Sequence, residues 1–358
     1  MSNHLLLYHN LKKQFLQWMP KERITRVRNF ALLITALYAS KSVHLSKIAN
    51  KLPVQGKVPS LTNRLWRLLD NERIKVQDWY SPLLEKMTTA LGSSKRVFLL
   101  VDTTKVGFNH RVLTIGAAFK KRALPLAWKV EKGSKGHTSH EVQIALFQYV
   151  ARFLTQITDI WVLGDSEFQS IPLLKWFGKQ GWNFVIRLKG SVKIKRKGND
   201  WIKISSLPLS EGETYYAGWV RVTEKHDAGW YWLILHWEKG EIEPWYLLSN
   251  KEGKRRLIKY YRRRMWIEAL FGDVKGHGFD LEATHLKNAA RINRLVLAVF
   301  IIFVWLISLG CWVVKRGYRH YVDVKSRRDK SYFRIGLDWI ERCFRIDEPV
   351  PLRFSLYF

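Results

Sequence analysis

The chain has 358 residues, of which 47% are hydrophobic and 14% aromatic, a composition that excludes a disordered tail and suggests two or three domains. Its 61 Lys and Arg residues against 30 Asp and Glu residues give a formal net charge of +31, which argues against an enzyme of small acidic metabolites. This charge indicates a polyanionic partner, with nucleic acid as the first candidate and a membrane-surface or ribosomal role as the alternative.

The two cysteines, Cys311 and Cys343, belong to no Cys-x-x-Cys pair, so a structural zinc site is not expected. Both fit buried free thiols in a reducing cytoplasm. The first residues lack the charged start and apolar core of a signal peptide. We therefore expect a cytoplasmic protein.

Residues 1–92 have helical patterns, including 23–40 and 45–52. A Pro- and Gly-containing break at 53–59 precedes a helix over 61–70, for which Ser60 is the expected N-cap. This last helix directs four leucines inward and leaves three polar side chains outward: Asn63, Arg64 and Arg67. The pattern fits a helix-turn-helix-like DNA reader, and it also fits a plain helical bundle with a basic surface.

From residue 97 the pattern changes to strands. Strands are predicted over 97–102, 112–119 and 124–130, then a helix over 139–153, a strand over 160–163, a helix over 169–180 and a strand over 183–188. This is the element order of a ribonuclease H-like core. His137 and His140 lie in the Gly/Ser/Lys-rich loop before the first of these helices, and we expect them to be DNA-contacting or solvated histidines, not metal ligands.

Two of these apolar strands end in an aspartate. Asp102 follows the run 97–101, and Asp165 follows 160–164. Sites in open α/β sheets form at the carboxyl ends of strands, and carboxylates there suit Mg²⁺ or Mn²⁺. Together with Glu268 further along the chain, the two aspartates can hold two divalent ions, the arrangement used for phosphodiester chemistry.

Residues 191–250 are rich in Trp and Tyr, with apolar runs that indicate antiparallel strands. We expect most of these rings to form the core of a small β subdomain inserted into the α/β core. One or two of them are candidates to stack on a base pulled from a duplex.

Residues 261–275 form the most informative helix. Tyr261, Arg264, Glu268 and Lys275 fall at roughly 0°, 300°, 340° and 320° around a helix of about 100° per residue, so all four share one face. Such a face offers a carboxylate to a metal and cations to phosphate. The glycines at 272, 276 and 278 can end this helix early, which would leave Lys275 on a loop.

Residues 295–314 contain no charge, and by length and hydropathy they are a candidate membrane span. No second such segment exists, and strongly basic chain lies on both sides, so the interpretation that we prefer is a helix buried on all sides. A basic loop over 325–330 and an amphipathic helix over 332–344, despite Gly336, follow it.

The residues of the 261–275 helix match the signature Tyr-x2-Arg-x3-Glu-x6-Lys at every position, and through them the chain resembles the DDE transposases of bacterial insertion sequences of the insertion-sequence-four type. One departure is visible, because the family often has Asp-Arg-Gly-Phe at its second aspartate and this chain has Asp-Ser-Glu-Phe over 165–168. The family's phosphate-facing Arg is therefore missing here and a further carboxylate, Glu167, is added.

The resemblance implies an α/β fold with a ribonuclease H-like catalytic core, an inserted antiparallel β subdomain, a helical N-terminal domain and a helical C-terminal tail. The expected division is 1–92 (DNA-binding), 93–190 (first part of the core), 191–250 (insertion), 251–316 (second part of the core) and 317–358 (tail). The implied catalytic and metal-binding residues are Asp102, Asp165 and Glu268, with two Mg²⁺ or Mn²⁺ ions. Tyr261, Arg264 and Lys275 would contact DNA.

The implied activity is cut-and-paste DNA transposition: cleavage at the ends of the element through a hairpin, followed by strand transfer to target DNA. The implied partners are double-stranded DNA, at the terminal inverted repeats and at the target, and a second copy of the chain in the synaptic complex. The expected location is the cytoplasm, associated with the nucleoid and not with a membrane. A transposase-derived DNA-binding protein or repressor with little or no catalysis is the alternative, and a basic single-span membrane protein would leave the signature face unexplained.

Overall fold

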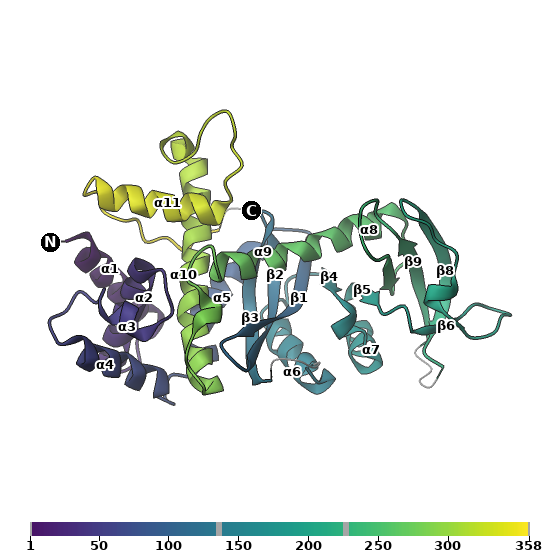
Figure 1. Ribbon diagram of the computed structural model, residues 1–358, viewed down its shortest axis with the longest axis horizontal. Helices are drawn as coiled ribbons and strands as arrows, with labels where there is room; N and C mark the ends of the chain where they lie inside the picture. The colour runs from purple at the N-terminus through teal and green to yellow at the C-terminus, as the bar shows by residue number, and fades with distance from the viewer. Residues whose placement is uncertain (1, 134–137, 225–228, 357–358) are drawn as a thin grey trace.

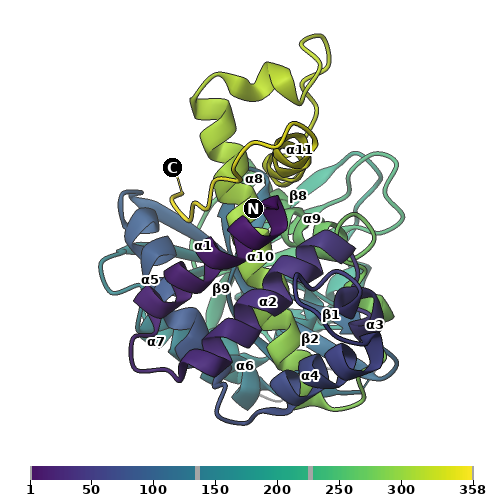
Figure 2. The ribbon, with the colours of Figure 1, turned by 90° about the vertical axis from the view of Figure 1, so that its left-hand side faces the viewer.

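The computed structural model of the chain describes residues 2–133, 138–224 and 229–356. Five helices come first: α1 (Asn3–Trp18), α2 (Ile24–Ser40), α3 (Leu45–Ala49), α4 (Val58–Asp70) and α5 (Val76–Gly92). In Figure 1, α1 to α4 gather at one end of the molecule, and Figure 2 shows that end face-on. The helical character predicted for residues 1–92 is confirmed.

Helix α4 confirms the expected inward and outward faces but not the expected cap. Its four leucines are buried, and Asn63, Arg64 and Arg67 are exposed. The prediction that Ser60 caps the helix is wrong, because the helix begins at Val58 with Pro59 in its first turn and Lys57 as the N-cap. Proline is favoured in the first helical turn, where its fixed φ fits and its missing N–H is not needed.

The strands and helices of the core follow in the predicted order: β1 (Arg96–Val106), β2 (His110–Phe119), β3 (Arg122–Lys132), α6 (His140–Ala151), β4 (Asp159–Gly164), α7 (Ile171–Lys179) and β5 (Asn183–Leu188). Strands β1, β2 and β3 are antiparallel neighbours, whereas β4 and β5 run parallel to β1. Strand β1 is longer than expected and continues four residues past Asp102, because β2 still pairs with it there.

The aromatic-rich region adds β6 (Lys193–Lys195), β7 (Ile202–Lys203), β8 (Thr214–Val222), β9 (Trp230–His236) and β10 (Trp245–Ser249). The expected antiparallel pairing is present. These strands do not form a separate sheet, because β10 pairs antiparallel with β5. In the described part of the chain the result is one ten-stranded sheet in the order β3-β2-β1-β4-β5-β10-β9-β8-β6-β7.

The expected helix over 261–275 is divided. Helix α8 (Arg255–Tyr261) passes through a 3₁₀ turn (Arg262–Arg264) into α9 (Met265–Val274). Figure 1 shows these segments running in line along the upper part of the sheet, while α6 and α7 lie along its lower part. Helix α9 ends before Lys275, in agreement with the early end that the glycines indicated.

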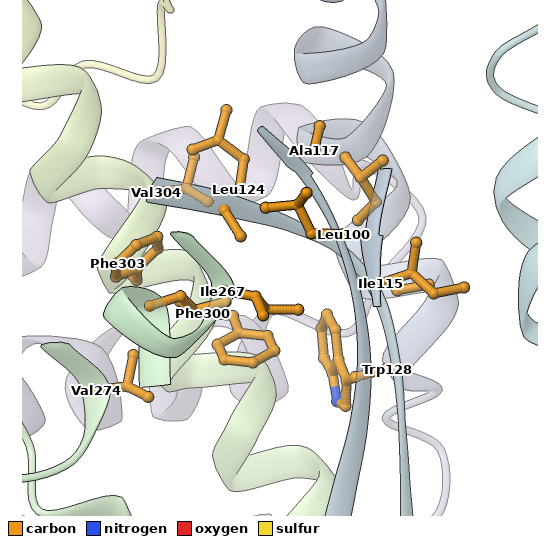
Figure 3. Close-up of a cluster of buried hydrophobic side chains, with 14 of the residues drawn as sticks. Leu100, Ile115, Ala117, Leu124, Trp128, Ile267, Val274, Phe300, Phe303 and Val304 are labelled. Atoms are coloured by element: carbon orange, nitrogen blue, oxygen red, sulfur yellow. The ribbon is translucent and has the colours of Figure 1, made fainter. Parts of the chain in front are cut away.

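Helix α10 (Ala289–Lys315) contains the apolar segment, and it is long and apolar enough to cross a membrane. In the structure it is a core helix, with 94% of its most apolar 18-residue window buried inside the protein. Figure 3 shows Phe300, Phe303 and Val304 of α10 packed near Leu124 and Trp128 of β3. The prediction of a helix buried on all sides is confirmed.

The tail crosses α10 at close range. Helix α11 (Tyr332–Arg345) includes Gly336, where an added Cβ would lie 2.0 Å from the carbonyl oxygen of Leu306; at Gly310 of α10 it would lie 1.9 Å from that of Tyr332. Only glycine permits this contact between the two helices, which is why Gly336 interrupts an amphipathic pattern without ending the helix. The cysteines of these two helices, Cys311 and Cys343, are buried free thiols as predicted.

Candidate active site

The two aspartates meet at one edge of the parallel part of the sheet. The pairing of β1 with β4 ends at Val101 and Gly164, and Asp102 and Asp165 are the next residues along the chain, Asp102 within β1 and Asp165 just after β4. Both carboxylates are held by backbone amides: the N–H of Thr103 donates to Oδ1 of Asp102, and that of Glu167 to Oδ1 of Asp165, each at 2.8 Å. Asp102 and Asp165 therefore lie side by side at the sheet edge, as predicted from the sequence.

Helix α9 brings the third carboxylate, and one guanidinium joins all three. Nη2 of Arg264 lies 3.0 Å from Oδ2 of Asp102 and 3.6 Å from Oδ2 of Asp165. Nη1 of Arg264 lies 2.6 Å from Oε1 of Glu268, one helical turn later. Three carboxylates from separate segments thus surround a single cation, which leaves the cluster with an excess of negative charge.

Burial shapes the electrostatics of this cluster. Asp102 is 8% exposed, and burial raises the pKa of its carboxyl to about 7, with Arg264 opposing the rise and Asp165 adding to it. Burial also acts against the charge of Arg264, but the surrounding carboxylates, Asp102 first, raise the pKa of the guanidinium above its usual value. Asp102 therefore binds a proton more readily than an exposed aspartate does, even with Arg264 beside it.

The donor set fits hard divalent cations. All three groups are carboxylates, the ligands that Mg²⁺ and Mn²⁺ prefer, and all reach the same positive group. Within residues 2–133, 138–224 and 229–356, no three His, Cys, Asp or Glu side chains stand close enough together to hold a metal ion directly. In the cluster the carboxylates contact the guanidinium of Arg264. Divalent cations at this point would take over contacts that Arg264 now makes.

The other two residues of the signature, Tyr261 and Lys275, lie in different surroundings. Tyr261 is 3% exposed, its ring packs edge-on against Trp245, and burial raises the pKa of its hydroxyl well above the usual range. Its ring has no free face for a base, although the charges of Arg264 and Asp165 act on its hydroxyl. Lys275 follows the end of α9 and pairs with Glu282 at 3.1 Å.

Arg264 lies on the predicted signature face, but its position among the three carboxylates of the cluster was not predicted from the sequence. The signal was available, because Arg264 and Glu268 are four residues apart, the spacing of helical ion pairs. The added Glu167 does not join the cluster; its carboxylate accepts the backbone N–H of Thr138 at 3.1 Å. His140 pairs with its neighbour Glu141, and His137 lies outside the described residues.

Two further surfaces carry residues that the sequence predicts to contact DNA. Arg64 of the exposed face of α4 donates to Oδ1 of Asn29 at 2.8 Å, so α2 holds this side chain in position. In the later strands most aromatic rings are covered, but Trp219 and Trp230 are 43% and 44% exposed. Trp232 meets the ring of Trp219 edge-on, and the guanidinium of Arg221 lies 5.9 Å from the ring centroid of Trp230, so each of these two rings is exposed in part. Tyr231 and Trp232 beside them are buried.

The sequence matches a family model described as the transposase DDE domain over residues 99–305, more than half of the chain, and the chain belongs to that family. The match spans the segments that carry Asp102, Asp165 and Glu268. Among solved structures, the chain is similar to a piggyBac transposase in a cryo-EM synaptic complex with hairpin DNA, at 13% identity and a TM-score of 0.44, covering 98% of this chain and 82% of that one. No curated protein matches it closely enough in sequence to be counted as a relative.

Proposed function

We propose that this DDE transposase is of the insertion-sequence-four type and moves its element by metal-dependent cut-and-paste transposition. The observation that carries the proposal is the convergence of Asp102, Asp165 and Glu268 on one cation. A structural ion pair needs one carboxylate for one guanidinium, whereas this cluster has three. The excess negative charge on hard oxygen ligands suits two divalent ions.

Asp102, Asp165 and Glu268 are the residues that would hold Mg²⁺ or Mn²⁺. Bound there, the ions would activate water or a 3′-hydroxyl and stabilise the leaving oxygen. The protein's contribution is orientation: backbone amides fix Asp102 and Asp165, and helix α9 carries Glu268 to them. The burial of Asp102 limits the access of water to this side of the cluster.

Arg264 has a double role in this proposal. Without the ions it neutralises part of the carboxylate charge, and with them it is released to bind a phosphate of the strand being cut. Lys275, which follows the end of α9, would bind a further phosphate. Arg264→Ala should therefore impair hairpin formation more than binding of the element end. A gel assay that separates binding, first nick and hairpin tests this; loss of binding with normal chemistry in the remaining complex would remove the role.

The remaining surfaces supply DNA recognition. The exposed Asn63, Arg64 and Arg67 of α4 would contact the terminal inverted repeats, and one of the exposed rings, Trp219 or Trp230, would stack on a base flipped out during hairpin formation. Both element ends are cut together in such a reaction, so we propose a homodimer in the synaptic complex.

We also propose that the protein is cytoplasmic and associated with the nucleoid. The burial of α10 inside the protein and the charge of +31 support this location. Cell fractionation with salt washes tests it, because high salt should release the protein. Retention in washed membranes until detergent is added would instead mean that α10 spans a bilayer.

The decisive experiment for the activity uses DNA that carries the ends of the element, taken from the sequence flanking the coding region. Asp102→Asn, Asp165→Asn and Glu268→Gln should each abolish Mg²⁺-dependent cleavage and retain end binding. Glu22→Gln is the matched control, because it removes a half-buried, ion-paired carboxylate far from the site. End binding without cleavage by the unmodified protein would favour a transposase-derived repressor.

A further inference from the structure

A second charged site lies away from the carboxylate cluster. A groove of about 990 Å³ forms where the turn between β2 and β3, the residues after α9 and the start of α11 meet. These segments are far apart in the chain but adjacent in the fold, near the top of Figure 1. Seven of the groove's lining side chains are Lys or Arg, and two are Asp.

The two acidic groups do not cancel this positive charge. Asp273 is buried and paired with Arg122, and Asp329 is paired with Arg327. Lys330 and Arg334 share one carboxylate, that of Asp338. Within the described parts of the chain, Lys120, Lys121 and Arg328 have no carboxylate partner, and they remain available to an external anion.

These three cations are also held in an unfavourable backbone conformation. Lys120 and Lys121 form the two-residue turn between β2 and β3 with φ values of 47° and 62°, and Arg328 has a φ of 46°. The left-handed region disfavours residues other than Gly, Asn and Asp, and turns of this kind usually contain Asn-Gly. Strained backbone conformations of this kind are typical of functional sites, so we infer that the two lysine side chains bind a ligand.

Both walls of the groove are fixed in place. The Arg122–Asp273 ion pair ties the β2–β3 turn to helix α9. On the opposite wall, Nη2 of Arg319 donates to the carbonyl oxygen of Arg328 at 2.7 Å, and Nζ of Lys330 donates to that of Val322. The free cations therefore project from a preorganised frame, which lowers the entropy lost when they bind a ligand.

We propose that this groove binds the phosphate backbone of duplex DNA, as a contact separate from the carboxylate site. Cations that come from several segments and line an open groove suit a repeating polyanion better than a single small phosphate. Glu268 and Asp273 lie five residues apart on α9, about 7.5 Å along a helix axis, so one helix links the groove to the carboxylate cluster. The inference requires DNA binding but does not require the carboxylates to cleave DNA.

The first test removes the three free cations and keeps the turn. In the variant Lys120→Asn/Lys121→Asn/Arg328→Asn each new residue tolerates the left-handed conformation, so folding should be preserved and is checked by thermal unfolding. The control Lys197→Asn/Lys203→Asn/Lys239→Asn removes three exposed lysines elsewhere: Lys197 and Lys203 at the β6–β7 edge of the sheet, and Lys239 between β9 and β10.

Binding of a fluorescent 40-base-pair duplex is measured at several salt concentrations. The groove variant should bind about tenfold more weakly near 0.1 M salt, and the slope of log affinity against log salt should fall by about 2 to 3, close to 0.9 for each lost phosphate contact. In the control variant, the slope of log affinity against log salt should fall by less than 1. Equal losses in the two variants, or no loss in the groove variant, would overturn the proposal.

The second test locates the DNA. Burial raises the pKa of the Cys311 thiol to about 12 and that of Cys343 to about 11, so a thiol-reactive photocrosslinker should react selectively at the site of a Lys121→Cys substitution. We expect crosslinks to duplex DNA that unlabelled duplex suppresses and polyglutamate does not. Suppression by polyglutamate at equal charge would mean a general acidic-ligand surface and would contradict the proposal.

Adding Asp102→Asn to the labelled protein separates the two proposals. The crosslink should persist in that background even though cleavage is lost, because the groove does not depend on the carboxylates. Loss of the crosslink in the correctly folded double variant would contradict the independence of the groove.

Discussion

The two ends of helix α9 each combine an arginine with acidic side chains, but in different proportions. At its start, Arg264 contacts three carboxylates, those of Asp102, Asp165 and Glu268. Near its end, Arg122 pairs with the single buried carboxylate of Asp273. The second pair is balanced and fastens β3 to α9, whereas the first cluster needs further positive charge. Charge balance, more than burial or distance, distinguishes a site from a structural ion pair here.

The strongest effect should be on DNA cleavage, which should depend on the carboxylates at the start of α9 and not on the one near its end. Asp102→Asn should reduce cleavage of element ends by at least about 10³-fold, since metal ligands contribute several kcal/mol to the transition state. Asp273→Asn should leave cleavage within about threefold of normal at a temperature where it stays folded. Both are measured with Mg²⁺ on the same DNA. If Asp273→Asn abolished cleavage without loss of structure, the balanced pair would be part of the site.

For the free energy of unfolding we expect the opposite: the substitution near the end of α9 should cost more than one at its start. Asp273 is 4% exposed, and Asp273→Asn leaves Arg122 without its charge partner, which should lower the free energy of unfolding by about 3 kcal/mol. Glu268 has a side chain 49% exposed, and Glu268→Gln should change stability by less than about 1 kcal/mol. Urea denaturation in EDTA compares them. Equal losses would show that the cluster at Arg264 is also a structural anchor.

Much of the fold could be predicted because its apolar runs are local signals. The order of β1 to β5 and the burial of α10 follow from such runs and from context. The pairing of β10 with β5, which makes the sheet continuous, could not be predicted because it depends on a distant contact. The side chain of Asn250 accepts the backbone N–H of Phe184 and donates to the carbonyl oxygen of Trp182, and these bonds hold β10 beside β5. No periodicity in either segment encodes that pairing.

The site was predictable to a similar degree. The strand-end rule brought Asp102 beside Asp165, and the signature spacing put Arg264 and Glu268 on a common face. A regular helix was assumed for that face, and the 3₁₀ turn over Arg262–Arg264 changes the rotation between Tyr261 and Glu268. The burial of Tyr261 against Trp245 and the position of Arg264 among carboxylates are tertiary contacts, which a helical wheel does not contain.

The next prediction concerns the effect of Arg264 on metal binding. If its guanidinium competes with divalent ions, Arg264→Gln should raise the Mn²⁺ affinity of the DNA-free protein by about tenfold, a fraction of the ~4 kcal/mol that a unit charge exerts at 4 Å in an effective dielectric of 20. Arg122→Gln, at the balanced pair, should leave Mn²⁺ affinity unchanged. Isothermal titration measures both. Weaker Mn²⁺ binding by Arg264→Gln would mean that the arginine organises the carboxylates for the ions.

The last prediction concerns the pH dependence of stability. Burial raises the pKa of Asp102 from 3.8 to about 7, so between roughly pH 4 and pH 7 the folded protein retains a proton that the unfolded chain has lost. Metal-free stability should therefore decrease as pH rises through this window and level off above it. Asp102→Asn lacks this titration, and the difference between the two urea-denaturation profiles in EDTA isolates it. A difference that instead favours the unmodified protein as pH rises would mean that Arg264 outweighs burial and lowers the pKa of Asp102. In that case the cluster would already be satisfied by its arginine, and the distinction from the Arg122–Asp273 pair would fail.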